Sequence, residues 1–149
     1  MAQYCTFRVA DLYFGVPVEQ VGEVLRQQRV TRVPLADPMV RGLINLRGEI
    51  VTAVDLRRRL SLPGLAGSED RMNLVLRRSD GSAVSLLVDS IGDVLELSDD
   101  LFEAPPVTLT GIAKTLVCRV CKLEGELLLV LDTVAAVLAE HERKEERAA

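Results

Sequence analysis

The chain repeats part of its own sequence twice, and this internal repeat constrains the fold more than any other feature. Gly48–Asp55 (GEIVTAVD) recurs as Gly125–Asp132 (GELLLVLD), 77 positions later. Val18–Leu25 (VEQVGEVL) recurs as Val88–Leu95 (VDSIGDVL), 70 positions later. Chance similarity between apolar β segments is the alternative explanation, but both matches come in the same order. The pattern favours two copies of one module, the second with 7 extra residues around Glu103–Pro106.

Short apolar runs separated by turn residues predict β-hairpins along most of the chain. Turns are indicated at Ala10-Asp11, Arg47-Gly48, Asp80-Gly81 and Glu124-Gly125, which places the four hairpins over residues 4–16, 42–57, 73–88 and 116–131. Pro17 ends a strand and can start a helical turn. The segment 18–27 is compatible with either a helix or a helical turn that runs into a strand. A short helix is expected over 55–60, and a helix with a charged end over 133–149.

Many short strands without long alternating helices are typical of small antiparallel barrels, and we expect two. The chain has 149 residues and is interpreted as one domain over 1–149. Its approximate halves are 13–63 and 72–138, joined by a flexible link at 64–70, with the N-terminal strand and the C-terminal helix packing across them. Because only 3% of the residues are aromatic, Val, Leu and Ile must fill the core.

The charge balance argues against a general nucleic-acid-binding protein. The formal net charge is −4, and phosphate binding needs clustered positive charge with stacking aromatics. Arg57-Arg58-Arg59 is the one local basic run, and we interpret it as a solvated first turn of a helix. A nucleic-acid-binding or other generic interaction module built on SH3-like barrels remains the alternative function.

The cysteines and the apolar runs indicate a cytoplasmic protein without a metal. Three cysteines is an odd number that suits a reducing compartment, and no apolar run has the length of a signal peptide or a membrane span. Cys118 and Cys121 have CxxC spacing within an expected strand, where residues three apart point to opposite faces. They therefore cannot share one metal ion, and the one histidine, His141, lies in the tail.

No catalytic constellation is found, so we expect no enzyme, no catalytic residue and no cofactor. There is no G-x-S-x-G, and Gly111–Thr115 lacks the glycines of a phosphate loop. A catalytic triad would have to use His141. Glu49 and Asp55 could approach each other, but surface or turn carboxylates explain them without chemistry.

Several segments in register carry a resemblance to a known family: Val30–Pro34, Gly42–Gly48, Val54–Arg57, Val88-Asp89 and Val94-Leu95. With these segments the chain resembles the CheW-type coupling proteins of bacterial chemosensory arrays, from about Tyr4 to Leu138. The Asn-Leu-Arg-Gly turn followed by Val-Asp-Leu-Arg is the specific part of the resemblance.

The resemblance implies a mainly β fold of two intertwined SH3-like five-stranded β-barrels with short helices and a C-terminal helix. It also implies a non-catalytic scaffold that couples chemoreceptor cytoplasmic tips to the regulatory domain of a CheA-type sensor histidine kinase. Nucleic acid and direct membrane insertion have no place in that role.

Five residues are candidates for partner binding. From the residues alone, Arg47 either points into water or contacts a partner, and Val21 belongs to the core by its spacing. The resemblance places Asn45 and Arg47 in the functional turn and Gly42 just before it. It places Val21 and Glu23 on a receptor-contacting surface.

Overall fold

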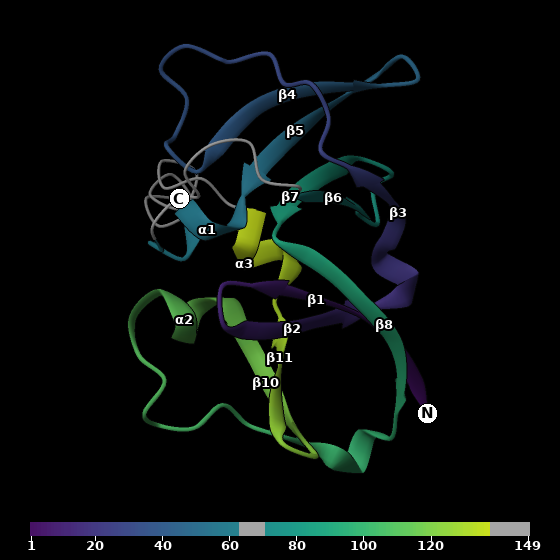
Figure 1. Ribbon diagram of the computed structural model, residues 1–149, viewed down its shortest axis with the longest axis vertical. Coiled ribbons are helices and arrows are strands. Elements are labelled where there is room, and N and C mark those ends of the chain that lie inside the picture. The colour runs from purple at the N-terminus through teal and green to yellow at the C-terminus, as the bar shows by residue number, and fades with distance from the viewer. Residues whose placement is uncertain (63–70, 138–149) are drawn as a thin grey trace.

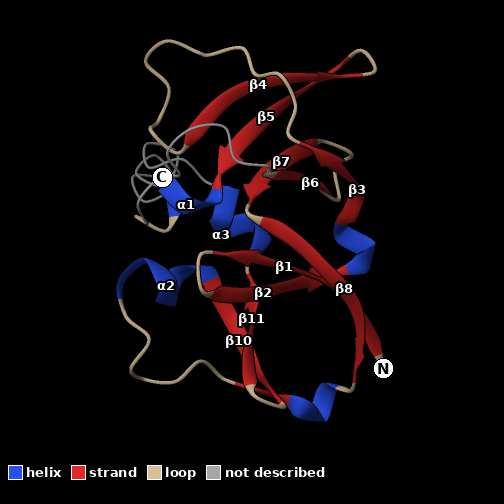
Figure 2. Ribbon diagram, in the orientation of Figure 1, coloured by secondary structure: helices blue, strands red, loops and turns tan. Residues whose placement is uncertain are grey.

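Two curved β-sheets make up the computed structural model, which describes residues 1–62 and 71–137 (Figure 1). The strands are β1 (Ala2–Val9), β2 (Leu12–Pro17), β3 (Val21–Arg26), β4 (Val40–Leu46), β5 (Glu49–Asp55), β6 (Met72–Arg77), β7 (Ala83–Val88), β8 (Ser90–Leu97), β9 (Phe102–Glu103), β10 (Val117–Leu123) and β11 (Glu126–Leu131). The helices are α1 (Leu56–Arg59), α2 (Gly111–Leu116) and α3 (Thr133–Val137), with 3-10 turns η1 (Val18–Gln20) and η2 (Asp99–Leu101). The expected mainly β class is confirmed, and Figure 2 shows how short the helices are.

Both sheets close on themselves in the same way. One sheet has the order β3-β6-β7-β5-β4, and Thr31, which follows β3, bridges Leu43 of β4. The other has the order β8-β1-β2-β11-β10-β9, and β9, which follows β8, pairs with β10. The chain leaving one edge strand thus pairs with the opposite edge strand. We call the first sheet and its connections barrel 1 and the second barrel 2, an arrangement consistent with two SH3-like barrels.

The strand pairing reproduces the sequence repeat. β5 runs parallel to β7 with Thr52 opposite Val84, and β11 runs parallel to β2 with Leu129 opposite Phe14. The shifts of 77 and 70 positions relate Thr52 to Leu129 and Phe14 to Val84. The same register therefore recurs in both barrels. Each repeat gives one hairpin, β1–β2 or β6–β7, to the sheet built from the other repeat, so the barrels are intertwined (Figure 1).

One apolar cluster joins the two barrels, and a smaller one lies within each. The shared cluster contains buried side chains from both sheets, including Phe7, Phe14, Val54 and Leu86, and the two phenylalanine rings stack with centroids 5.5 Å apart. The smaller clusters contain Tyr4, Leu97, Cys121, Leu128 and Val130 in barrel 2, and Ile44, Leu46, Val51, Ala53 and Val75 in barrel 1. Aliphatic side chains dominate all three, as the composition predicted.

The structure settles the local predictions with two corrections. The four hairpins are present, and the segment left open is the turn η1 followed by β3. The arginine run does form a helical turn, but it is not solvated as predicted: Arg59 is buried, and the Arg57 side chain is only 12% exposed. Asp55 is not a surface carboxylate either, because it is buried at the end of β5.

Two predictions reach beyond the described residues. The link at 64–70 lies outside them, and so does the part of the C-terminal helix that follows α3. Within the part of the chain that the structure describes, no helix is long and apolar enough to cross a membrane.

Candidate functional site

The turn between β4 and β5, which we call the β4–β5 tip (Asn45–Glu49), presents an arginine on a stiff support. Arg47 and Gly48 both have positive φ, 51° and 88°, and Gly48 donates its backbone N–H to Asn45 Oδ1 at 2.9 Å. Asn45 thus fixes the turn from within. The Arg47 side chain is 77% exposed, and one of its nitrogens pairs with the carboxylate of Glu23 on β3. Most guanidinium donors remain free to face a partner.

Gly42 has a backbone that only glycine adopts easily. Its φ is 148°, and it lies at an irregularity in the pairing of β4 with β5. A Cβ there would be 2.3 Å from the carbonyl oxygen of Thr31 and 2.4 Å from Cγ1 of Val30. Thr31 closes barrel 1 through its bridge to Leu43. Gly42 therefore lets the barrel close and orients the strand that leads to the β4–β5 tip.

Glu23 and Val21 lie on β3, the strand that the β4–β5 tip reaches. The ion pair with Arg47 brings Glu23 to the tip although the two residues are 24 positions apart. Val21 is partly buried and packs against the shared apolar cluster, as its spacing indicated. The structure thus brings together Glu23, Asn45 and Arg47 at one surface, while Gly42 and Val21 lie behind it as support.

Two features beside the β4–β5 tip were not predicted as site residues. Ile50 lies opposite Asn45 in the hairpin and is 62% exposed, so an apolar side chain accompanies the arginine. Arg77 donates two hydrogen bonds of 2.9 Å to the carboxylate of Glu49, and these lower the pKa of Glu49. The alternation along β5 could have identified Ile50, because Val51 and Ala53 face the core. Arginine is one of the residue types enriched at protein interfaces, where the fully buried core of the patch is also more apolar than its rim.

An ionic network at the junction of the barrels, with Asp55 and Arg71 buried and Arg57 and Asp89 partly buried, was also missed. Arg71 donates to both carboxylate oxygens of Asp55, at 3.2 and 2.8 Å. Arg57 donates through Nε and Nη2 to Asp89, at 2.9 and 2.7 Å for the shortest contacts. The backbone N–H of Ala10, in the β1–β2 turn, also donates to Asp89 at 2.7 Å. Asp89 connects β7 to β8, so this carboxylate ties elements of both barrels together.

Burial and the neighbouring arginines shift the pKa of the acids in this network in opposite directions. Burial alone would raise the pKa of Asp55, but the hydrogen bonds and charge of Arg71, with backbone N–H donors, hold it below the usual value. Burial would likewise raise the pKa of Asp89, and the donors Arg57 and Ala10 lower it overall. Both carboxylates are therefore charged at neutral pH, as buried ion pairs require.

The cysteines do not form a reactive pair. Cys118 is exposed on β10 whereas Cys121 is buried in barrel 2, so their side chains lie on opposite faces, as predicted. Burial raises the pKa of Cys5 and Cys121, and for Cys118, whose Sγ lies partly buried against the carbonyl of Val130, desolvation of the thiol and the charge of Asp132 raise the pKa. A raised pKa keeps a thiol protonated and poorly nucleophilic. In the described ranges, no group of three or more His, Cys, Asp or Glu side chains could hold a metal ion.

Comparisons with known proteins agree with this architecture. The CheW-like domain model matches residues 3–141. The chain is 29% identical over 133 residues to the chemotaxis protein CheW of Treponema pallidum, covering 87% of this chain and 78% of the relative. It is also 29% identical over 131 residues to CheW of Bacillus subtilis, covering 88% and 83%. The crystal structure of the scaffolding protein TtCheW from Thermoanaerobacter tengcongensis has the same fold, with a TM-score of 0.80, 24% identity and 88% of each chain covered. Because the family model spans nearly the whole chain, this protein belongs to the CheW-like domain family.

Proposed function

We propose that the protein is a non-catalytic scaffold of a bacterial chemosensory array, located in the cytoplasm. In this role it couples the cytoplasmic tips of chemoreceptors to the regulatory domain of a CheA-type histidine kinase. The match of the CheW-like family model to residues 3–141 carries the proposal. The exposed arginine on a rigid hairpin, with an exposed isoleucine beside it, supports a docking role.

The five candidate residues have different roles in this proposal. Arg47 and Glu23 face the partner, because Arg47 is exposed at the β4–β5 tip and the partly exposed carboxylate of Glu23 on β3 pairs with it. Asn45 and Gly42 position them, through the turn hydrogen bond and through barrel closure. Val21 holds β3 against the core and so fixes the strand that carries Glu23.

The first experiment tests whether Arg47 contacts a partner. Arg47→Glu should abolish most co-sedimentation with receptor and kinase, because a planar set of donors is replaced by a repelling charge. Folding should survive, since an exposed ion pair contributes at most about 1 kcal/mol. Arg8→Glu is the matched control: Arg8 is also an exposed arginine in an ion pair, with Glu126, but in barrel 2. Circular dichroism checks that both variants are folded.

The double variant Glu23→Arg with Arg47→Glu separates anchoring from partner contact. It restores an ion pair between the β4–β5 tip and β3 but reverses both charges on the surface. We expect it to fold normally and still fail to assemble. Full recovery of assembly would reduce Arg47 to a residue that only anchors the turn. Kinase-dependent phosphorylation of the unaltered chain would contradict the scaffold role itself.

A further inference from the structure

Positive and negative charge are segregated between the two barrels. The barrel 1 segments 18–62 and 71–88 contain 11 arginines and 6 acidic residues. The barrel 2 segments 1–17 and 89–137 contain 4 basic and 10 acidic residues. A net charge of −4 for the whole chain therefore conceals a basic half. Local charge, and not net charge, decides which partner a surface attracts.

The basic half contains a hollow lined by three arginines. The hollow has a volume of about 210 Å³ and lies between the connection from β3 to β4, the start of β4, and α1. Arg32, Arg41 and Arg58 line it, together with a single carboxylate, Asp37. We call it the arginine hollow, defined by these four residues with Val33 and Leu35 on its wall.

Two of the three guanidinium groups in the arginine hollow have no partner among the described residues. Arg58 donates to the carbonyl oxygen of Pro38 at 3.2 Å and lies 3.7 Å from Asp55, so it is held in place. Within residues 1–62 and 71–137, the side chains of Arg32 and Arg41 have no ion pair or hydrogen bond. Arg41 is also half-buried, which makes its charge costly to leave unpaired.

An unusual leucine lies on the wall of the same hollow. Leu35 is fully exposed, at 105%, and its φ of 62° is in the left-handed region. Full exposure and a positive φ are both unfavourable for leucine, and nothing in the isolated chain compensates for them. Val33, 39% exposed, lies near it on the same wall. The site therefore offers two apolar contacts beside three positive charges.

We propose that the arginine hollow binds an acidic segment of a partner protein, in which carboxylates alternate with apolar side chains. Arginine pairs with carboxylates through two parallel hydrogen bonds, which suits Arg32 and Arg41 with their unused donors. The apolar side chains of the segment would cover Leu35 and Val33. No aromatic ring is among the residues that line the hollow, so base stacking is not available to a nucleic acid there.

This surface is distinct from the β4–β5 tip. Arg41 lies at the beginning of β4 and Arg47 lies just past its end. Arg47 is six positions further along the chain than Arg41, a distance of roughly 20 Å at about 3.3 Å per residue. The inference therefore does not depend on the proposed array function, and either one can fail without the other.

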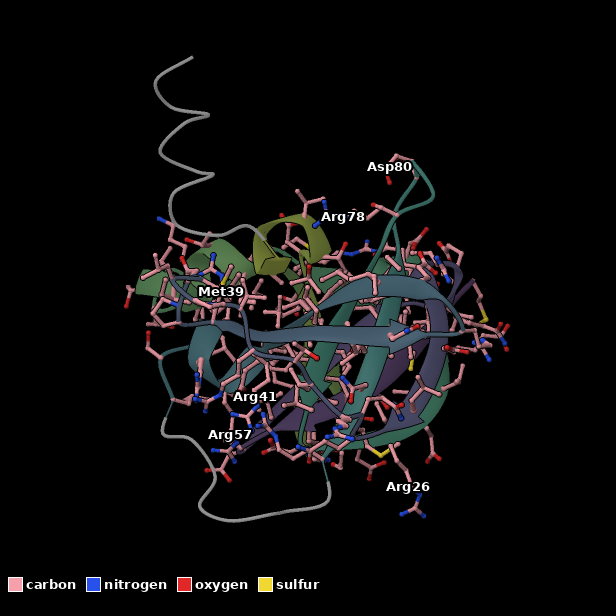
Figure 3. All side chains as sticks on the ribbon, turned by 90° about the horizontal axis from the view of Figure 1, so that it is seen from above. Arg26, Met39, Arg41, Arg57, Arg78 and Asp80 are labelled. Atoms are coloured by element: carbon pink, nitrogen blue, oxygen red, sulfur yellow. The ribbon has the colours of Figure 1, made fainter. Side chains whose placement is uncertain are left out.

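A fluorescein-labelled peptide of the sequence EELEELEE is the probe, measured by fluorescence anisotropy with the full-length protein at low salt. Arg32→Glu with Arg41→Glu should weaken binding at least about tenfold, because two attractions become repulsions. Arg26→Glu with Arg78→Glu is the matched control, with the same charge change at two exposed arginines that Figure 3 places well away from Arg41. The control should change the affinity less than about twofold. Backbone amide shifts on titration should centre on residues 32–41 and 58.

Four outcomes would overturn the proposal. They are no binding of the peptide at millimolar concentration, equal weakening in the control variant, equal affinity for a QQLQQLQQ peptide, and tighter binding of single-stranded DNA than of the acidic peptide. Sedimentation velocity adds a fifth measurement. A dimer that dissociates only in Arg32→Glu with Arg41→Glu would assign the hollow to a second copy of this chain and would likewise contradict the proposal.

Discussion

Gly42 shows at the scale of one residue how the closure of barrel 1 depends on a missing side chain. Gly42→Ala should lower the free energy of unfolding by more than about 2 kcal/mol, because a Cβ would overlap the Thr31 carbonyl oxygen at a backbone φ that alanine disfavours. Urea unfolding measures the loss. Gly125→Ala is the control, because Gly125 has a φ of 76° but open space around it. It should lose only about 1 kcal/mol, and an equal loss in both variants would contradict the steric argument.

At this scale the sequence predicted the turn but not the contacts that its residues make with distant segments. Gly48 predicted a hairpin turn because glycine favours tight turns within a few positions. The ion pair from Arg47 to Glu23 and the contact of Gly42 with Thr31 join segments that only the closed barrel brings together. A local pattern carries no information on such contacts, so only the structure explains why position 42 needs a glycine.

β5 shows at the scale of one element why the core strands tolerate little change. Val54 is 1% exposed and belongs to the shared cluster, whereas Ile50 on the same strand is 62% exposed. Val54→Asp should unfold the protein or lower its free energy of unfolding by about 3 kcal/mol or more, since it buries an unpaired carboxylate. Ile50→Asp should change stability by less than about 1 kcal/mol. Thermal denaturation separates them, and an unchanged melting temperature for Val54→Asp would refute the burial argument.

The elements themselves were largely predictable, and the exceptions have physical causes. Period-two apolar runs with turns identified the four hairpins, since these signals are local. The helix over Leu56–Arg59 was also expected, but its burial was not, because arginine is usually exposed. Arg57 and Arg59 can be mostly buried because acceptors from distant elements take their hydrogen bonds. The carboxylate of Asp89 accepts from Arg57, and the carbonyl oxygen of Ala135 accepts from Arg59. Such partners cannot be found from one helix alone.

At the scale of the whole molecule, the two junctions between the repeats differ. The repeat shifts relate Arg57 to Val134 and Asp89 to Glu19. On one side Arg57 and Asp89 form an ion pair at 2.7 Å. On the other side Glu19 and Val134 line a hollow of about 440 Å³. The counterpart junction has no ion pair between these positions, but the hydroxyl of Thr133 donates a hydrogen bond to Oε1 of Gln20 across it at 3.0 Å. One junction is therefore held by charge and its counterpart by a neutral hydrogen bond, so Asp89 supplies the charged contact that fixes the two barrels relative to each other.

The pH dependence of stability tests this role of Asp89. Its pKa is below the usual 3.8 in the folded protein, so its charged form stabilises the fold above about pH 4, and this contribution is lost as the pH falls below 3.8. Asp89→Asn should lower the free energy of unfolding at pH 7 by about 1.5 to 3 kcal/mol, the usual worth of hydrogen bonds to a charged group. The difference in the free energy of unfolding between the variant and the unaltered protein should shrink as the pH falls from about 5 to about 3.

Urea unfolding at each pH measures that difference, and Asp11→Asn serves as the control, because Asp11 is an exposed carboxylate in the same β1–β2 turn. The control should differ little from the unaltered protein at every pH, since an exposed acid gains little from folding. A loss in Asp89→Asn that stayed constant from pH 7 to pH 3 would mean that the shape of the side chain matters and its charge does not. The two barrels would then be held by packing of the shared cluster and by neutral acceptors such as the carbonyl of Ala135, and the charge of the ion pair with Arg57 would be incidental to their arrangement.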